Sequence, residues 1–399
     1  MKKALKILAL ILSLAMVFSL AACGSQGGTS STGSGSGSAG IPKDELKIGV
    51  IHIGDPADGS GYSYAHDQGI VGMQKNLGLR DDQIVRKLNI SDSDLSAIKE
   101  AIEACIAEGC NLIFGTSYGY MDTMETLAAE HPDVYFSHGT GYLSNDTNFN
   151  NYFGRIYQAR YLAGVAAGLK TETNKIGYVA AYGTELAETS SGINAFALGA
   201  QSVNPDAVVY VKTLNSWFDP ANETAYAEAL LQMGCDVISQ HCDTANPQIA
   251  AEKAGKWGCG YNSDMTEQAP GAHLTATIWH WDVYYTAAAE AVVNGTWKEF
   301  GNYYGGYADG LVGISPLSEN CAEGTADYIS QVEALYNANS WDVFSGVKLS
   351  FDENGKLVQT DAALMDNAGN EIVAAGGPSI EDSVITGTMN YFVAGVELK

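Results

Sequence analysis

Two successive series of short apolar runs alternating with helix-like segments constrain the fold of this chain most. The runs are rich in β-branched residues and carry few polar positions, which is typical of strands buried on both faces of a parallel sheet. Such series predict an α/β fold with two doubly wound lobes. We expect strands over 48–53, 111–114, 134–136, 176–180, 208–211 and 237–239, and helices over 94–108, 121–130, 192–202, 223–233 and 247–254.

The stretch 47–69, KIGVIHIGDPADGSGYSYAHDQG, joins the first strand to a Gly-rich aromatic loop. Gly54 and Pro56 end the strand, and the small residues at 58–61 allow a ligand to approach the backbone closely. Open α/β sheets bind ligands beyond the carboxyl ends of their strands. This loop is therefore a candidate binding site, although Tyr62 and Tyr64 could instead only anchor the next helix on the sheet.

The N-terminal segment 1–22 has the pattern of an export signal. Three lysines precede an apolar stretch that ends in Leu-Ala-Ala, and Cys23 follows directly. Leu-Ala-Ala-Cys resembles the lipobox of bacterial lipoproteins, which implies a diacylated Cys23 as the mature N-terminus. The Gly/Ser/Thr tract that follows predicts a flexible tether over 23–46.

The chain is strongly acidic, with 21 basic and 46 acidic residues and a formal net charge of −25. This balance excludes nucleic acid and anionic lipid surfaces as partners, apart from a lipid anchor. After Cys23, six cysteines remain, at 105, 110, 235, 242, 259 and 321. Their spacing shows no CxxC pair or zinc pattern, so we expect no metal site and interpret most of them as small buried hydrophobic residues.

The loops after the expected strands are rich in aromatic and acidic residues. Flat apolar faces combined with a few carboxylates and amides suit a planar polar heterocycle, whereas a phosphate site would show a Gly-rich loop with lysine. No cofactor is expected, since Gly59-Ser60-Gly61 does not continue as GxGxxG. The candidate binding residues are Tyr62, Ser63, Tyr118, Trp217, Asp219, Asp243, Asn262, Asp264 and Trp279, and a further aromatic turn is expected over 152–157.

Three other interpretations compete for these residues. His241, Cys242 and Asp243 are adjacent in sequence, and neighbouring residues of a strand point to opposite faces, which disfavours a nucleophile or metal site. His66 and Asp67 beside Asp58 could serve acid–base chemistry, but such groups near a helix start more often cap the helix or orient a ligand. The run 279–285 also suits core packing between lobes.

The C-terminal part of the chain has a different sequence pattern from the rest, with short β-type runs separated by turn residues. Asn354-Gly355 and Gly369-Asn370 each lie between β-type runs and predict hairpin turns. The sequence Asp352-Glu353-Asn354-Gly355 lacks the ligand spacing of an EF-hand, so a hairpin is the better interpretation than a calcium loop.

Taken in order, the motifs GYSYAHDQG, GTSYGY, SGINAFALGA, SWFDPANE, QHCDTANP, GYNSDM and WHWDVYY resemble the basic membrane protein family of ABC-transporter substrate-binding lipoproteins. The resemblance spans nearly the whole mature chain. It implies a periplasmic-binding-protein type I fold, with two lobes joined by three crossovers and a purine nucleoside or nucleobase trapped between them. It also implies delivery to a permease and an ATPase, and no catalysis.

The resemblance also implies roles for individual residues. The stacking aromatic of the first loop falls on Tyr62, its polar neighbour on Ser63, and the second stacking aromatic on Trp217. The carboxylate that the family uses for ribose hydroxyls is replaced by Asn262, and the assisting lysine is replaced within Ile278-Trp279-His280. These departures favour a free base such as adenine over a nucleoside.

We expect lobe 1 to comprise 47–156 and about 279–300, and lobe 2 to comprise 157–278 and about 301–399, including the hairpins. The protein is expected to be a monomer held by lipid on the outer face of the cell membrane. Two alternatives stay open at this stage. One is an exported nucleoside or glycoside hydrolase using Asp58, His66 or Asp243, and the other is a ligand sensor that docks on a signalling receptor.

Overall fold

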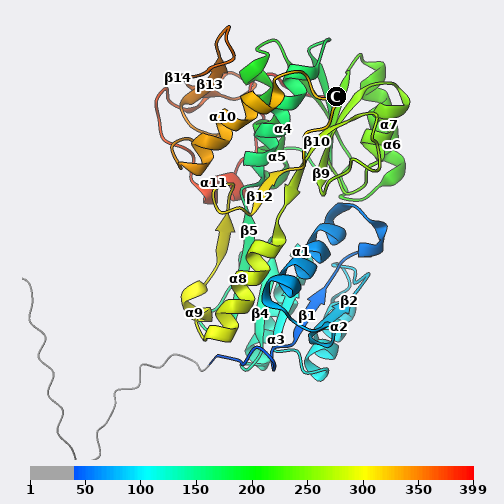
Figure 1. The fold of residues 1–399 in the computed structure, drawn as a ribbon, viewed down its shortest axis with the longest axis vertical. Coiled ribbons are helices and arrows are strands. Elements are labelled where there is room, and N and C mark those ends of the chain that lie inside the picture. Colours follow the sequence, from blue (N-terminus) through cyan, green and yellow to red (C-terminus); the bar gives the residue numbers. More distant parts are fainter. Residues whose placement is uncertain (1–39) are drawn as a thin grey trace, which may run out of the picture. The chain divides into compact units, whose positions relative to one another are not determined.

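The computed structural model describes residues 40–399. The expected signal segment and Cys23, and most of the tether, lie outside the described residues. Within residues 40–399, every helix is too short or too polar to cross a membrane. Two large sheets organise this part of the chain, and the sheets with their covering helices are called lobe 1 and lobe 2 (Figure 1).

Lobe 1 contains a six-stranded sheet in the order β11-β5-β4-β3-β1-β2. Its strands are β1 (Ile48–Ile51), β2 (Ile84–Lys87), β3 (Leu112–Gly115), β4 (Tyr135–Gly139), β5 (Phe149–Gly154) and β11 (Tyr303–Gly305). Its helices are α1 (Gly61–Leu77), α2 (Leu95–Ala107), α3 (Met121–Glu130), α8 (Trp281–Asn294) and α9 (Trp297–Phe300). All strand pairs of this sheet are parallel.

Lobe 2 contains a seven-stranded sheet in the order β12-β10-β9-β8-β6-β7-β17. Its strands are β6 (Lys175–Ala180), β7 (Val208–Thr213), β8 (Val237–His241), β9 (Trp257–Asn262), β10 (His273–Trp279), β12 (Val312–Ile314) and β17 (Val396–Leu398). Its helices are α4 (Ile156–Lys170), α5 (Ala187–Val203), α6 (Pro220–Gln232), α7 (Asn246–Lys253), α10 (Thr325–Asn337) and α11 (Asp382–Gly387). Only β12 runs antiparallel to its neighbour among the described strands of this sheet.

The chain passes between the two sheets from β5 to α4, from β10 to α8, and from β11 to β12. These three crossovers and the parallel sheets confirm the predicted fold class. Both faces of each sheet are covered by helices. In lobe 1, α1 and α8 pack on one face and α2 and α3 on the other. In lobe 2, α4 and α5 cover one face and α6 and α7 the other.

Local sequence explains where α2 begins and which side it buries. Asp94 is the N-cap, and its carboxylate accepts hydrogen bonds from the backbone N–H groups of Ser96 and Ala97, each at 3.1 Å. Ile98, Ile102 and Cys105 then recur at helical spacing and are fully buried against the sheet.

Two sequence expectations about elements need correction. The stretch 152–157 is no aromatic turn, because Tyr152 belongs to β5 and Tyr157 to α4, and both side chains are buried. Helix α5 begins at Ala187 instead of 192, because the polar run before Gly192 forms its first turns. The run 187–191 carries no apolar periodicity, so its helical state could not be inferred from spacing.

The C-terminal expectations are confirmed. Asn354-Gly355 connects β13 (Val347–Phe351) to β14 (Leu357–Asp361), and Gly369-Asn370 connects β15 (Leu364–Met365) to β16 (Glu371–Val373), both antiparallel. Of the six cysteines described, five are buried and Cys321 is part-exposed, and all are free thiols.

Candidate functional site

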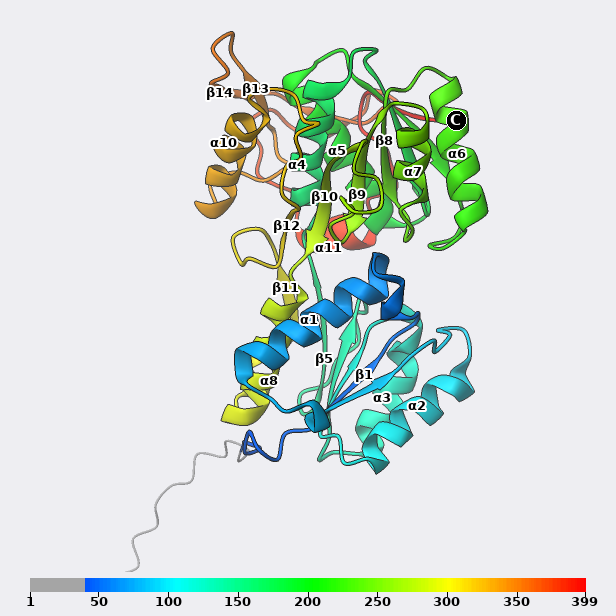
Figure 2. The ribbon, with the colours of Figure 1, turned by 45° about the vertical axis from the view of Figure 1, so that its right-hand side comes forward.

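The strand orders of the two sheets mark a topological switch point in each lobe. Strand β1 lies between β2 and β3, and β6 lies between β7 and β8. The connections after neighbouring strands therefore leave toward opposite faces of the sheet, and ligands bind beyond the carboxyl edge at such points. The region where the two carboxyl edges meet, at Gly61 and Ser263, is called the crevice below. Tyr62 follows β1, and Asp243 follows β8. Figure 2 shows the N-terminal end of α1 directed toward β9 of lobe 2.

The lobe 1 face of the crevice is formed by the first turn of α1. Ser63 accepts a hydrogen bond through Oγ from the backbone N–H of Gly54 at 2.9 Å, which fixes the loop after β1. The Tyr62 hydroxyl donates to the backbone carbonyl of Thr116, which follows β3. The Tyr62 ring also meets the His66 ring edge-on, with centroids 4.4 Å apart. Tyr62 is thus held in one orientation across the switch point.

A buried aromatic layer supports this face. His66 Nδ1 lies 2.6 Å from the hydroxyl of Tyr285, which lies 2.9 Å from the hydroxyl of Tyr152. The His66 ring stacks on Trp281 with centroids 4.5 Å apart. Burial lowers the pKa of His66 well below its usual range, so the imidazole is neutral at physiological pH. His66 therefore acts as a support for Tyr62.

The lobe 2 face contains Asp243 and Asn262, which lie after β8 and at the end of β9. Asn262 has a left-handed backbone with φ of 68°, a conformation that asparagine tolerates better than most residues. Its Nδ2 donates to Oδ1 of Asp243 at 3.1 Å. Burial, followed by the charge of Glu223, raises the pKa of Asp243 to about 8. The amide thus orients a carboxyl group that is mostly protonated at neutral pH.

The two faces touch at Gly61. Its backbone N–H donates to Ser263 Oγ at 3.2 Å, and a Cβ at this position would collide with the carbonyl oxygen of Asp243. Burial raises the pKa of Tyr62 well above its usual range, and the ionisable groups of Glu188, Tyr261 and Asp243 in lobe 2 add to that rise. Ionisable groups of lobe 2 therefore lie near the Tyr62 side chain, which is part-exposed.

Behind this face lies a group of four residues, called the Arg160 cluster below: Arg160, Glu188, His241 and Tyr261. Sequence reasoning considered His241 only for nucleophilic or metal chemistry and missed the other three. The Arg160 guanidinium lies 4.1 Å from the centre of the Tyr261 ring and donates through Nη1 to the Gln240 carbonyl at 2.7 Å. His241 Nε2 lies 3.9 Å from Glu188 Oε1. Burial raises the pKa of Glu188 to about 7 and lowers that of His241 well below its usual range.

Trp217 lies beside the Arg160 cluster. It is part-exposed and meets the rings of Tyr182 and His241 edge-on, with centroids 5.6 and 5.5 Å away. Its carbonyl accepts from the backbone N–H of Asp243 at 3.0 Å, which joins the two loops. Asp219 instead caps α6, where its carboxylate accepts from the backbone N–H of Asn222 at 3.1 Å.

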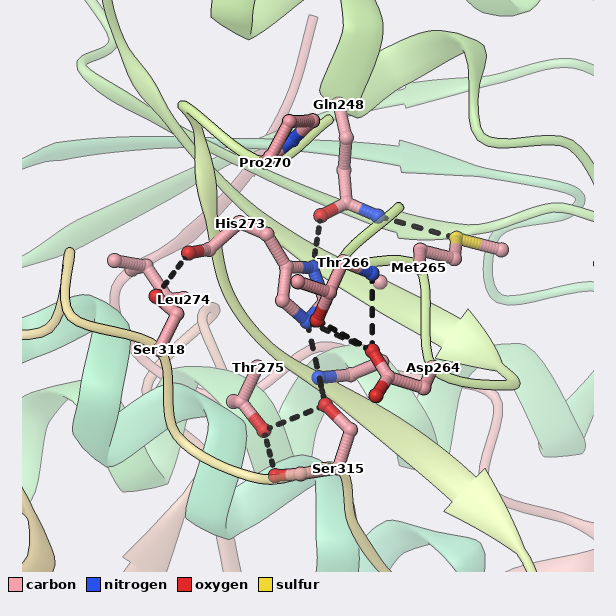
Figure 3. A network of polar contacts seen from close by, with 12 residues as sticks. Gln248, Asp264, Met265, Thr266, Pro270, His273, Leu274, Thr275, Ser315 and Ser318 are labelled. Carbon is pink, nitrogen blue, oxygen red and sulfur yellow. Dashed lines mark hydrogen bonds and ion pairs between the residues drawn. The ribbon is translucent and has the colours of Figure 1, made fainter. Parts of the chain in front are cut away.

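Other candidate residues lie in different surroundings. Tyr118 keeps 54% of its surface exposed. Trp279 is buried and stacks on Trp281 with centroids 4.3 Å apart, in the core near the crossovers. Asp264 is exposed and accepts from the backbone N–H and the hydroxyl of Thr266 at 2.9 and 2.6 Å (Figure 3). It also lies 3.6 Å from His273, within a network that stiffens the turn after β9.

The residues proposed for hydrolysis are not brought together by hydrogen bonds. Asp58 is exposed in a short 3₁₀ helix, Pro56–Asp58. His66 is engaged by Tyr285, and Asp243 by Asn262. Among residues 40–399, His, Cys, Asp and Glu form no group of three or more that could hold a metal ion.

Comparison with known proteins decides the family. The family described as ABC transporter substrate-binding protein, PnrA-like, matches residues 46–340. The chain belongs to this family. This PnrA-like substrate-binding protein is 36% identical to a purine-binding protein of Brucella abortus over 364 residues. The match covers 91% of this chain and 96% of the relative. The chain is also 33% identical to a putative ABC transporter glucose-binding protein of Haloferax volcanii over 346 residues, 87% of this chain and 85% of that one.

A solved ABC-transporter solute-binding protein from Conexibacter woesei shares the fold, with a TM-score of 0.60 at 17% identity. The match covers 74% of this PnrA-like chain and 98% of the other. The resemblance inferred from the motifs is therefore confirmed at the level of family and fold. The signals that could have revealed the missed residues are weak: Arg160 is a lone cation within a mostly apolar helix, and Glu188 lies in a polar run.

Proposed function

We propose that this PnrA-like protein captures a purine base between its two lobes and hands it to the permease and ATPase of an ABC importer. The observation that carries the proposal is the contact at Gly61, which brings Tyr62 on lobe 1 next to Asp243 and Asn262 on lobe 2. An aromatic face opposed by carboxyl and amide groups suits a planar heterocycle with several hydrogen-bonding atoms. The name of the Brucella relative supports a purine, and that of the Haloferax relative makes glucose the comparison ligand.

Asn262 favours a base over a nucleoside. A ribose presents paired hydroxyl groups, which a carboxylate accepts strongly because charge-assisted hydrogen bonds exceed neutral ones. The Asn262 Nδ2 group already donates a hydrogen bond to Asp243, and the buried Oδ1 of Asn262 has no hydrogen-bond partner among residues 40–399. The neutral amide lacks the charge and the second oxygen with which a carboxylate accepts from paired hydroxyl groups, and a buried mismatch costs about 1–3 kcal/mol. We therefore expect adenine or another purine base to bind more tightly than its nucleoside.

Calorimetric titration of the protein without its leader tests this function. The ligands are adenine, hypoxanthine, guanine, their nucleosides and glucose. The proposal predicts binding of a base, weaker binding of its nucleoside, a smaller gap in Asn262→Asp, and unchanged ligand after incubation. Binding of glucose without any purine would refute it, and a nucleoside preferred over its base would refute the argument from Asn262. Cleavage of a nucleoside would instead support the hydrolase alternative.

The location is the second part of the proposal. Leu-Ala-Ala before Cys23 supports lipid attachment on the outer face of the cell membrane, with the Gly/Ser tract as tether. Cys23→Ala should either release the protein into the medium or leave the leader uncut, as followed by fractionation and intact mass. Membrane retention of a cleaved Cys23→Ala protein would contradict a lipid anchor at this residue.

A further inference from the structure

The carboxyl group of Glu188 lies beside the buried side chain of His241 and is still part-exposed. Glu188 is in the first turn of α5, the helix that follows β6. Its side chain keeps 24% of its accessible surface, and burial is the main cause of the rise in its pKa. The carboxyl group is therefore packed among protein atoms on most sides and still reached by solvent. No hydrogen bond from residues 40–399 accounts for any part of its pKa.

Its neighbours also keep unused hydrogen-bonding atoms. His241 is fully buried, and neither ring nitrogen has a hydrogen-bond partner within residues 40–399. Arg160 is 1% exposed, and its Nε and Nη2 are likewise unsatisfied by the described residues. Buried polar atoms are nearly always paired, because an unpaired one loses its hydration without compensation. Their concentration beside Glu188 marks a polar surface made for a ligand.

The groups that face Glu188 come from several elements. Arg160 on α4 lowers its pKa, and His241 on β8 lies 3.9 Å away. Its charge in turn acts on Asp243 after β8 and on three hydroxyl groups, those of Tyr62 on α1, Tyr261 on β9 and Tyr304 on β11. Arg160 is the one cation in this set, and it forms no ion pair with Glu188 in the described chain. A ligand here meets the Glu188 carboxyl group beside unsatisfied polar atoms of Arg160 and His241.

We propose that Glu188 contacts the ligand and determines its specificity, by accepting a hydrogen bond from the exocyclic amine of an aminopurine that stacks beside Tyr62. An aminopurine presents this amine next to ring nitrogen acceptors, which matches a carboxyl group placed beside unsatisfied donors. The proposal rests on the proposed function and narrows it from a purine base to one with an amino group. Asp243 and Asn262 bond to each other, so Glu188 is the carboxyl group of this set whose pKa owes nothing to a hydrogen bond from the described residues.

The affinity ratio of adenine to unsubstituted purine tests this contact, because the two ligands differ only in the amine. Glu188→Leu removes both carboxyl oxygens at similar volume and should lower that ratio at least tenfold. Glu188→Gln keeps a carbonyl acceptor and should preserve most of the ratio. Glu185→Leu is the matched control, because Glu185 is exposed three residues earlier and accepts only from the backbone N–H of Gly183, at 2.9 Å. Its ratio should equal that of the unmodified protein.

The possible outcomes distinguish failure of the proposed purine function from failure of the proposed Glu188 contact. If the unmodified protein binds no purine base, hypoxanthine and guanine included, the proposed function fails. If it binds another base but neither adenine nor purine, only the proposed role of Glu188 fails. If it binds both equally, or if folded Glu188→Leu keeps the ratio, the proposed role of Glu188 is wrong and the purine function stands. If Glu188→Leu does not fold, the ratio in Glu188→Gln decides, since loss of the ratio there also contradicts an acceptor role.

Discussion

The two faces of the crevice are built differently. On lobe 1 the hydroxyl groups are used internally, since Tyr62 bonds to Thr116, and Tyr152 and Tyr285 bond to each other. On lobe 2, the side chains of Glu188 and His241 have no hydrogen-bond partner within the described chain. The first face is a preorganised aromatic surface, and the second offers unpaired polar atoms to another molecule. Substitutions in the buried hydroxyl network of lobe 1 should therefore affect stability, and substitution of Glu188 on lobe 2 should affect recognition.

Gly61, where the faces meet, should give the largest effect. Gly61→Ala should weaken ligand binding about 100-fold, or about 2.7 kcal/mol, because its Cβ would collide with Asp243 when the lobes close. Gly59→Ala is the control. Gly59 has a similar positive φ of 73°, compared with 84° at Gly61, but no described atom lies within 4 Å of its added Cβ. Equal losses in both variants would attribute the effect to backbone strain alone.

On lobe 1, Tyr285→Phe should lower the free energy of unfolding by about 2 kcal/mol. The substitution leaves the buried His66 Nδ1 and the Tyr152 hydroxyl without the group that lies 2.6 and 2.9 Å from them. Chemical denaturation of the ligand-free protein measures the change, and ligand affinity should stay within a few-fold. A large loss of affinity with unchanged stability would show that this network of lobe 1 serves recognition, and would contradict the difference between the two faces.

The aromatic residues on the two sides should contribute similarly to affinity. Stacking on a base is worth about 1–3 kcal/mol, so Tyr62→Ala and Trp217→Ala should each weaken binding about tenfold or more. Calorimetry on variants shown to be folded by circular dichroism checks this. Nearly unchanged affinity in both variants would show that neither aromatic ring stacks on the ligand.

Ligand-free stability should respond to Glu188 in a pH-dependent way. The pKa of Glu188 is about 7 in the folded state and about 4.3 when unfolded, so the folded state alone holds the proton between these values. Stability therefore falls as pH rises through this window. Glu188→Gln should be more stable than the unmodified protein by about 1 kcal/mol at pH 8, and nearly equal at pH 4. Destabilisation by the substitution at pH 8 would indicate a structural role.

The sequence predicted the sheets better than the site. Apolar periodicity is local, so it located six of the thirteen strands of the two large sheets, including β1 and β8, which precede Tyr62 and Asp243. Asp219 and Asp264 bond to nearby backbone, as acidic residues at turns and helix starts often do, and their contact with a ligand stays a prediction. Arg160 and Glu188 gave no comparable pattern. Their meeting depends on how α4 and α5 pack on lobe 2, which spacing along the chain does not encode.

A crystal structure of the protein with bound adenine tests the central claim most directly. The account predicts the base stacked on Tyr62, with its exocyclic nitrogen about 2.7–3.2 Å from a Glu188 carboxyl oxygen. It also predicts that His241 or Arg160 donates a hydrogen bond to a ring nitrogen. Adenine bound away from both Tyr62 and Glu188, or held there with its amine facing only solvent, would contradict the account.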